Sequence, residues 1–125
     1  MKKILHLSIL IVTLLMLSAC TSLPLYNVDK HKIDNPASSQ KVYSAIKQAG
    51  RHLGWKITSI KPGKARGKLY LRKHVAVVNI YYNSRSFSIH YVSSKNLKYD
   101  GQKKTIHKNY NSWVQNLERE IDVRL

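Results

Sequence analysis

Acidic residues and cysteine are scarce in this chain, and their scarcity excludes several kinds of protein. The 125 residues include six Asp and Glu against 22 Lys and Arg, and a single cysteine, Cys20. One thiol cannot form an internal disulfide, so packing alone must stabilise the fold. Hydrolases with paired carboxylates need two acids facing each other across a cleft. No such pair is indicated here, since the acids are Asp29, Asp34, Asp100, Glu118, Glu120 and Asp122.

Other catalytic and metal-binding patterns are also missing. The sequence has no Gly-x-Ser-x-Gly elbow and no His-x-x-x-His pair, so we predict no enzyme, no metal site and no cofactor. The segment PGKARGK at 62–68 is one residue short of a phosphate loop and is predicted to turn into a strand. A small hydrolase that brings Asp100 and His107 together is a third alternative. A simpler interpretation is that His107 caps the last helix.

The first twenty residues have the layout of a secretory signal. Lys2 and Lys3 precede a mostly apolar run over 4–17, and small residues follow before Cys20. The run is shorter than the roughly 20 residues of a spanning helix, although an uncleaved anchor is an alternative. Leu17-Ser18-Ala19-Cys20 matches the lipobox of bacterial lipoproteins at all four positions, and the N-terminus therefore resembles theirs.

This resemblance implies a lipid anchor. It implies diacylglycerol on the Cys20 sulfur, cleavage before Cys20 and acylation, with palmitate for example, of the new N-terminus; two or more acyl chains anchor stably. Thr21 rather than Asp follows the cysteine, which in Gram-negative lipoproteins favours the outer membrane, facing the periplasm. The expected organisation is a signal peptide over 1–19, a lipid-anchored tether over 20–37 and a small basic domain over 38–125.

The net charge predicts anionic partners. It is +16 for the whole chain, and +14 once Lys2 and Lys3 leave with the signal peptide. Such a charge attracts anionic lipid, lipopolysaccharide, acidic cell-wall polymers and nucleic acid without choosing among them. A charge that serves only solubility is the alternative.

Hydrophobic periodicity predicts an α+β fold. Apolar residues at helical spacing over 39–53, with Gly54 as a stop, indicate a first helix. Alternating segments at 55–60, 65–71, 75–82 and 87–92 indicate four strands, of which 75–82 is apolar on both faces and suits the centre of a sheet. A polar loop at 93–106 and a helix at 108–124 follow. We expect a two-layer sandwich in which a four-stranded antiparallel meander has N- and C-terminal helices on one face, in the order α-β-β-β-β-α.

The second predicted strand carries a candidate anion-binding face. Cations at alternating positions stand about 7 Å apart on one surface, which suits a row of phosphates, and an aromatic among them could stack on a base or sugar. The alternative is an ordinary solvated sheet face. The residues are Lys64, Arg66, Lys68, Arg72 and Tyr70.

The C-terminal half carries a second resemblance. The residues concerned are Ser94, Asn96, Leu97, Tyr99, Ile106, His107, Tyr110, Asn111, Trp113, Val114, Asn116 and Leu117. This pattern resembles that of a family of small, uncharacterised proteobacterial lipoproteins with an Ile-His-x-x-Tyr-Asn-x-Trp-Val motif, and it implies no activity. Asn96, Tyr99, His107 and Asn111 could line a small polar pocket. Alternatively, they pin the loop to the last helix through hydrogen bonds and caps.

Together these patterns predict a non-enzymatic envelope lipoprotein. We expect it to bind an anionic envelope component or an envelope protein through its basic sheet face. A surface lipoprotein that captures DNA is the alternative function, because the same cations and Tyr70 would suit nucleic acid.

Overall fold

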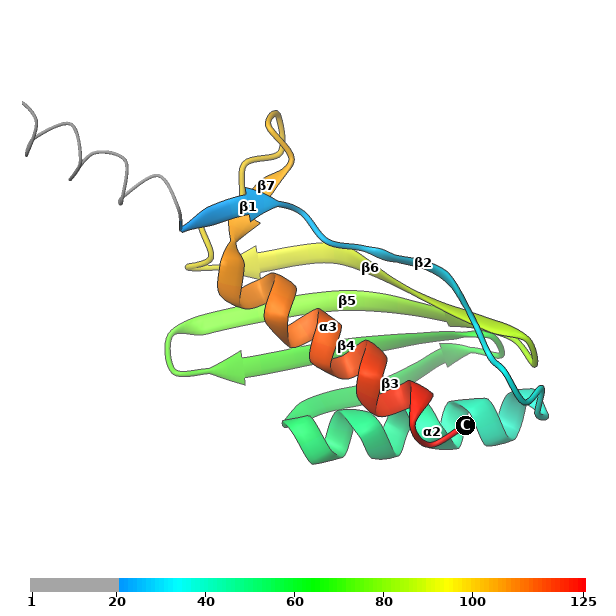
Figure 1. The fold of residues 1–125 in the computed structure, drawn as a ribbon. Helices are drawn as coiled ribbons and strands as arrows, with labels where there is room; N and C mark the ends of the chain where they lie inside the picture. Colours follow the sequence, from blue (N-terminus) through cyan, green and yellow to red (C-terminus); the bar gives the residue numbers. More distant parts are fainter. Residues whose placement is uncertain (1–20) are drawn as a thin grey trace, which may run out of the picture.

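The computed structural model describes residues 21–125, which form one sheet of five antiparallel strands, one small two-stranded sheet and two helices (Figure 1). The predicted signal peptide and Cys20 lie outside the described residues. In the large sheet the strand order is β2-β6-β5-β4-β3, with β2 (Val28–Lys32), β3 (Trp55–Lys61), β4 (Lys64–Leu71), β5 (His74–Tyr82) and β6 (Ser86–Lys95). The small sheet pairs β1 (Ser22–Pro24) with β7 (Thr105–His107), and the helices are α2 (Ser39–Leu53) and α3 (Lys108–Asp122).

The first helix has the predicted bounds because both of its ends have clear signals. Ser38 accepts a hydrogen bond from the Lys41 backbone and caps the start of α2. Gly54 ends the helix in the left-handed conformation, with φ of 86°, which glycine adopts at little cost. Among residues 21–125, neither α2 nor α3 is long and apolar enough to cross a membrane.

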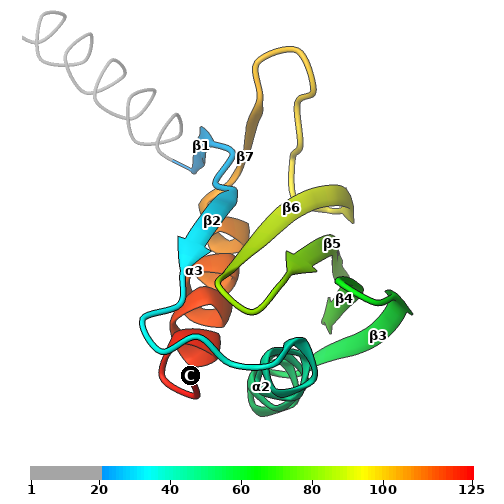
Figure 2. The ribbon, with the colours of Figure 1, turned by 90° about the vertical axis from the view of Figure 1, so that its right-hand side faces the viewer.

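The two helices cover one face of the sheet, as expected for the α+β fold (Figure 2). Ala65 and Leu69 of β4, and Ala76, Val78 and Ile80 of β5, are buried toward the helices. The residues between them point to the other face, where Val75 and Val77 are only partly buried. β5 lies at the centre of the sheet, as predicted from its apolar run.

The sheet has five strands rather than the predicted four. β3 to β6 form the expected meander, and β2 joins its far side by pairing with β6. β2 belongs to the segment 20–37 that the sequence predicted to be a tether. A bulge at Lys30, whose φ is 50°, breaks the alternation that would have marked the strand. Val28 and Ile33 nevertheless join the core, with 3% and 1% of their surfaces exposed.

The predicted polar loop at 93–106 is also more ordered than expected. β6 continues to Lys95, and residues 105–107 form β7 against β1. Leu97 and Ile106 are buried, which fixes both ends of the loop to the core. The segment next to Cys20 is therefore part of the folded domain.

Candidate functional site: a basic sheet face and an acid–histidine network

The uncovered face of the sheet gathers most of the predicted anion-binding residues. Lys64, Arg66, Lys68 and Tyr70 alternate with the buried residues of β4 and so share the face away from the helices. Arg72 does not belong to this face. It follows the end of β4 and lies in the β4–β5 turn with φ of 56°, so its inclusion in the row was wrong.

Two lysine pairs face each other across β3 and β4. Lys56 is the direct partner of Lys68, and Lys61 is the direct partner of Lys64. Like charges directly opposite on neighbouring strands destabilise a sheet. Sequence reasoning missed Lys56 and Lys61, because the register that brings them opposite β4 cannot be read from either strand alone. We call Lys56, Lys61, Lys64, Arg66, Lys68 and Tyr70 the open basic face.

No carboxylate neutralises the open basic face. Among residues 21–125, the only Lys or Arg in an ion pair is Arg124, which bonds Glu120. Arg66 instead donates from Nε and Nη2 to Asn79 Oδ1, both at 3.3 Å. Lys64 Nζ lies 5.5 Å from the centre of the Tyr81 ring. Tyr70 is 64% exposed beside these cations. The face therefore presents positive charge and an aromatic ring to solvent.

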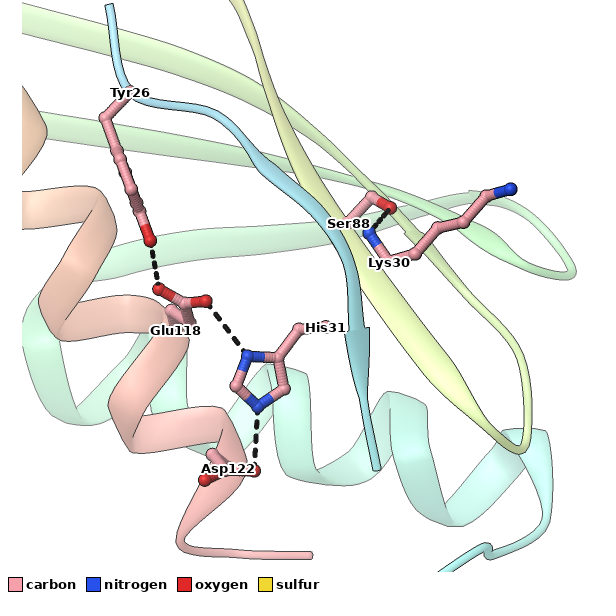
Figure 3. A network of polar contacts seen from close by, with 6 residues as sticks. All are labelled: Tyr26, Lys30, His31, Ser88, Glu118 and Asp122. Atoms are coloured by element: carbon pink, nitrogen blue, oxygen red, sulfur yellow. Dashed lines mark hydrogen bonds and ion pairs between the residues drawn. The ribbon is translucent and has the colours of Figure 1, made fainter. Parts of the chain in front are cut away.

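On the helical side of the molecule, four residues form a polar network (Figure 3). His31 of β2 lies between two carboxylates of α3, with Nδ1 at 2.9 Å from Glu118 and Nε2 at 3.0 Å from Asp122. The Tyr26 hydroxyl donates to the other oxygen of Glu118 at 2.6 Å. The His31 ring also stacks on Phe87, with 4.8 Å between centroids. Tyr26 and His31 are thereby both fixed to α3.

The network shifts the ionisation of its members. Burial lowers the pKa of His31, but hydrogen bonds to Glu118 and Asp122 outweigh it, so the pKa is raised overall. The hydrogen bond to Glu118, with burial and the charge of Glu118, raises the pKa of Tyr26 to about 12. Since each nitrogen of the His31 ring faces a carboxylate oxygen, the ring donates from both only when it is protonated.

The network borders an open depression of about 420 Å³. Within the part of the chain that the structure describes, no cluster of three or more His, Cys, Asp and Glu has the arrangement of a metal site. Sequence reasoning noted the acids of the last helix and the dispersed histidines, but it did not connect His31 with Glu118, which is 87 positions away. The lining residues are His31, Gln115, Glu118, Arg119 and Asp122.

The four residues of the predicted polar pocket have separate partners. Asn111 is buried, accepts from the Tyr26 backbone at 3.0 Å and donates to the Pro24 carbonyl at 2.9 Å. Asn96 donates to the Lys73 carbonyl at 2.6 Å. Tyr99 packs on Tyr91, with 4.3 Å between ring centroids. These contacts fit the alternative interpretation, in which the residues pin loops and the N-terminal segment in place.

His107 and Asp100 are likewise occupied by local bonds. His107 Nδ1 accepts from the Asn109 backbone and caps α3, as the simpler interpretation predicted. Burial, with the charges of Lys98, His74 and Lys108, lowers the pKa of His107. Asp100 Oδ1 accepts hydrogen bonds from the backbone N–H groups of Gln102 and Lys103. The bond from Lys103 is the main cause of the lowered pKa of Asp100.

Comparison of this chain with known protein families, with curated proteins and with solved structures finds no match in any of the three. The open basic face and its surroundings therefore carry the functional argument.

Proposed function

We propose that this protein is a non-enzymatic lipoprotein of the bacterial envelope, anchored through Cys20, that binds a phosphate-bearing polyanion through the open basic face. The lipobox at 17–20 supports the anchor, and Thr21 after Cys20 supports an outer-membrane site facing the periplasm. Lipopolysaccharide and anionic phospholipid are phosphate-bearing components of the envelope with suitable chemistry.

The two cross-strand lysine pairs carry the proposal. Lys56 against Lys68 and Lys61 against Lys64 cost stability in the free protein because no acid lies between them. A phosphate placed between two lysines would relieve their repulsion and form charge-assisted hydrogen bonds with both. A face that served only solubility would gain nothing from placing its cations directly opposite one another.

The spacing along β4 supports a polymeric or multiply charged ligand. Lys64, Arg66 and Lys68 recur at every second residue, so their side chains leave the sheet about 7 Å apart. Arg66 is held by Asn79, which limits the freedom that it loses when it binds an anion. The net charge of the chain adds long-range attraction for the same ligands.

Binding measurements with charge reversal test the proposal. The chain from Thr21 to Leu125 would be titrated with lipopolysaccharide, with phosphatidylglycerol vesicles and with duplex DNA over a salt series. We expect Lys64→Glu, Arg66→Glu and Lys68→Glu together to weaken binding to the preferred anion far more than reversal of cations elsewhere does. The matched control reverses three exposed cations of α2, Lys41→Glu, Lys47→Glu and Arg51→Glu, which changes the net charge equally.

The outcomes separate the proposal from its alternatives. Equal loss in both triple variants would show that only net charge matters, and would overturn the open basic face as a site. Tightest binding to DNA, weakened by Tyr70→Ala as well as by the charge reversals, would instead support nucleic-acid capture. Binding to lipopolysaccharide alone that weakens steadily with added salt, but persists at physiological salt and is lost in the β4 triple variant, would identify the ligand class.

A further inference from the structure

A second group of cations surrounds the point where the domain begins. The Thr21 carbonyl accepts a hydrogen bond from the Lys108 backbone at 2.9 Å, and the Leu25 backbone donates to the Lys104 carbonyl at 2.9 Å. Between them, β1 pairs with β7, with Ser22 opposite His107. The residue that follows Cys20 is thus bonded to the start of α3, and the strand after it is bonded to the end of the β6–β7 loop.

The β4–β5 turn is tied to the same end of the domain. Asn96 donates to the Lys73 carbonyl at 2.6 Å, and His74 Nδ1 bonds the Asn96 carbonyl at 2.7 Å. The β6–β7 loop extends from the sheet beside β1 and β7 in both ribbon views (Figures 1 and 2). We call the exposed cations of these segments the anchor pole: Arg72, Lys73, Lys98, Lys103, Lys104 and Lys108.

The anchor pole is almost free of negative charge. Its one acid is Asp100, whose Oδ1 is already bonded to two backbone N–H groups of the loop. The remaining acids lie in residues 29–34 and 118–122, the second group in the last part of α3. Two exposed apolar side chains accompany the cations, Leu23 at 43% and Tyr99 at 38%. Cations with a tyrosine and an aliphatic side chain suit the headgroup region of a membrane.

Only a short length of chain separates the lipid anchor from the anchor pole. A tether over 21–37 could have reached about 55 Å from the membrane. Because β1 begins at Ser22, only Cys20 and Thr21 separate the acyl chains from folded structure, a span of about 7 Å. A lipidated Cys20 therefore holds the anchor pole within contact distance of the headgroups.

We propose that the anchor pole is a docking surface for the anionic headgroups of the membrane that holds Cys20. The inference depends on the lipid anchor of the proposed function but not on the open basic face. Docking through the anchor pole fixes the orientation of the domain on the membrane. Each of its cations near an anionic surface strengthens docking by about fivefold.

Site-specific probes on the lipidated full chain test this proposal. Lipidation occupies the sulfur of the single native cysteine, so an introduced cysteine accepts a fluorophore at one position. Gln102→Cys places the probe in the β6–β7 loop, and the matched control, Gln40→Cys, places it in the first turn of α2. Both positions are exposed. The proteins would be reconstituted into vesicles of phosphatidylcholine, with or without phosphatidylglycerol, that contain headgroup quenchers.

We expect strong quenching at position 102, weak quenching at position 40, and loss of the difference without phosphatidylglycerol. Lys98→Glu, Lys103→Glu and Lys104→Glu together should reduce quenching at position 102 to the level at position 40, while the same reversals at Lys41, Lys47 and Arg51 should not. Equal quenching at both probes would overturn the docking surface. Quenching at position 102 that is unchanged by the charge reversals in the loop would overturn it as well.

Vesicle flotation separates this inference from the proposed function. Chains that float with the vesicles but show no quenching at position 102 refute the docking surface alone. Chains that fail to float lack the anchor, which refutes both the docking surface and the anchored part of the proposed function.

Discussion

His31 and Glu118 join the edge strand β2 to the last helix across 87 positions of sequence, through Nδ1 and Oε2 atoms 2.9 Å apart. Asp122 bonds the second ring nitrogen of His31, and Tyr26 bonds the second oxygen of Glu118. This arrangement fixes the N-terminal segment onto α3, and it makes that attachment sensitive to protonation.

The first prediction concerns pH. The pKa of His31 is raised in the folded chain, so its contribution to stability is complete below about pH 6.5, the unfolded value. It is lost as pH rises through the folded pKa. We expect wild type to exceed His31→Gln in free energy of unfolding by on the order of 1 kcal/mol at pH 5.5, and by less at pH 8.5. Urea denaturation at both pH values measures the difference.

The variant also serves as the control for other histidines. The pKa of His107 is lowered, so the contribution of His107 to stability depends on pH in the opposite sense. His107 is present in both proteins, so its contribution cancels when the stability of His31→Gln is subtracted from that of wild type at each pH. A difference between the two proteins that stays constant or grows from pH 5.5 to 8.5 would contradict the assigned role of His31.

The second prediction concerns Tyr110, whose hydroxyl is buried without a hydrogen-bond partner within residues 21–125. Burial raises the pKa of this hydroxyl, as expected for a group far from water. Tyr110→Phe removes the unsatisfied oxygen and keeps the ring that meets Tyr91 edge to face. We expect a gain of about 1 kcal/mol in the free energy of unfolding, measured by urea denaturation. A loss of stability would show that the hydroxyl has a partner in solution.

The third prediction concerns Asn111, which bonds both the Tyr26 backbone and the Pro24 carbonyl. Asn111→Ala leaves two backbone groups without partners and should cost about 2 kcal/mol. Hydrogen exchange should accelerate in residues 21–33 and remain slow in β4 and β5. The exposed neighbour Ser112→Ala is the matched control and should change neither quantity appreciably. Uniform acceleration over the whole chain would mean that the segment is not an independent unit.

The fourth prediction separates stability from binding on the open basic face. Lys68→Glu converts the cross-strand pair with Lys56 into an attractive one and should stabilise the protein by about 0.5 kcal/mol. The same change should weaken the binding of phosphate-bearing anions. Lys56→Glu should act alike, and the double variant should lose the gain in stability because two acids then face each other. Thermal denaturation and lipopolysaccharide titration measure the two effects.

Local signals account for the parts of the fold that the sequence predicted. Ser38, Gly54 and the stripe from Val42 to Ala49 determine α2 within a single segment, and the prediction of 39–53 is confirmed. β3 to β6 have the residue patterns of strands and are joined by short turns, so neighbouring strands pair in the order of the chain. Helix α3 was placed correctly apart from its last two residues.

Long-range partners determine the parts that the sequence did not reveal. β2 has a bulge at Lys30 and depends on a distant strand, β6, for its pairing. The lysine pairs of the open basic face depend on strand register, and Arg72 was misplaced because the strand ends at Leu71. The His31 network needs the relative position of β2 and α3, which no local pattern encodes.

The position of β1 and β2 has a consequence for the order in which the chain folds. Each hydrogen-bond partner named above for residues 21–33 lies between Ser86 and Asp122. As the chain is synthesised from its N-terminus, β2 has nothing to pair with until β6 has emerged, and β1 has nothing to pair with until β7 has emerged. Export and any modification of Cys20 would therefore act on an extended chain, and docking of β1 and β2 would be the last step of folding.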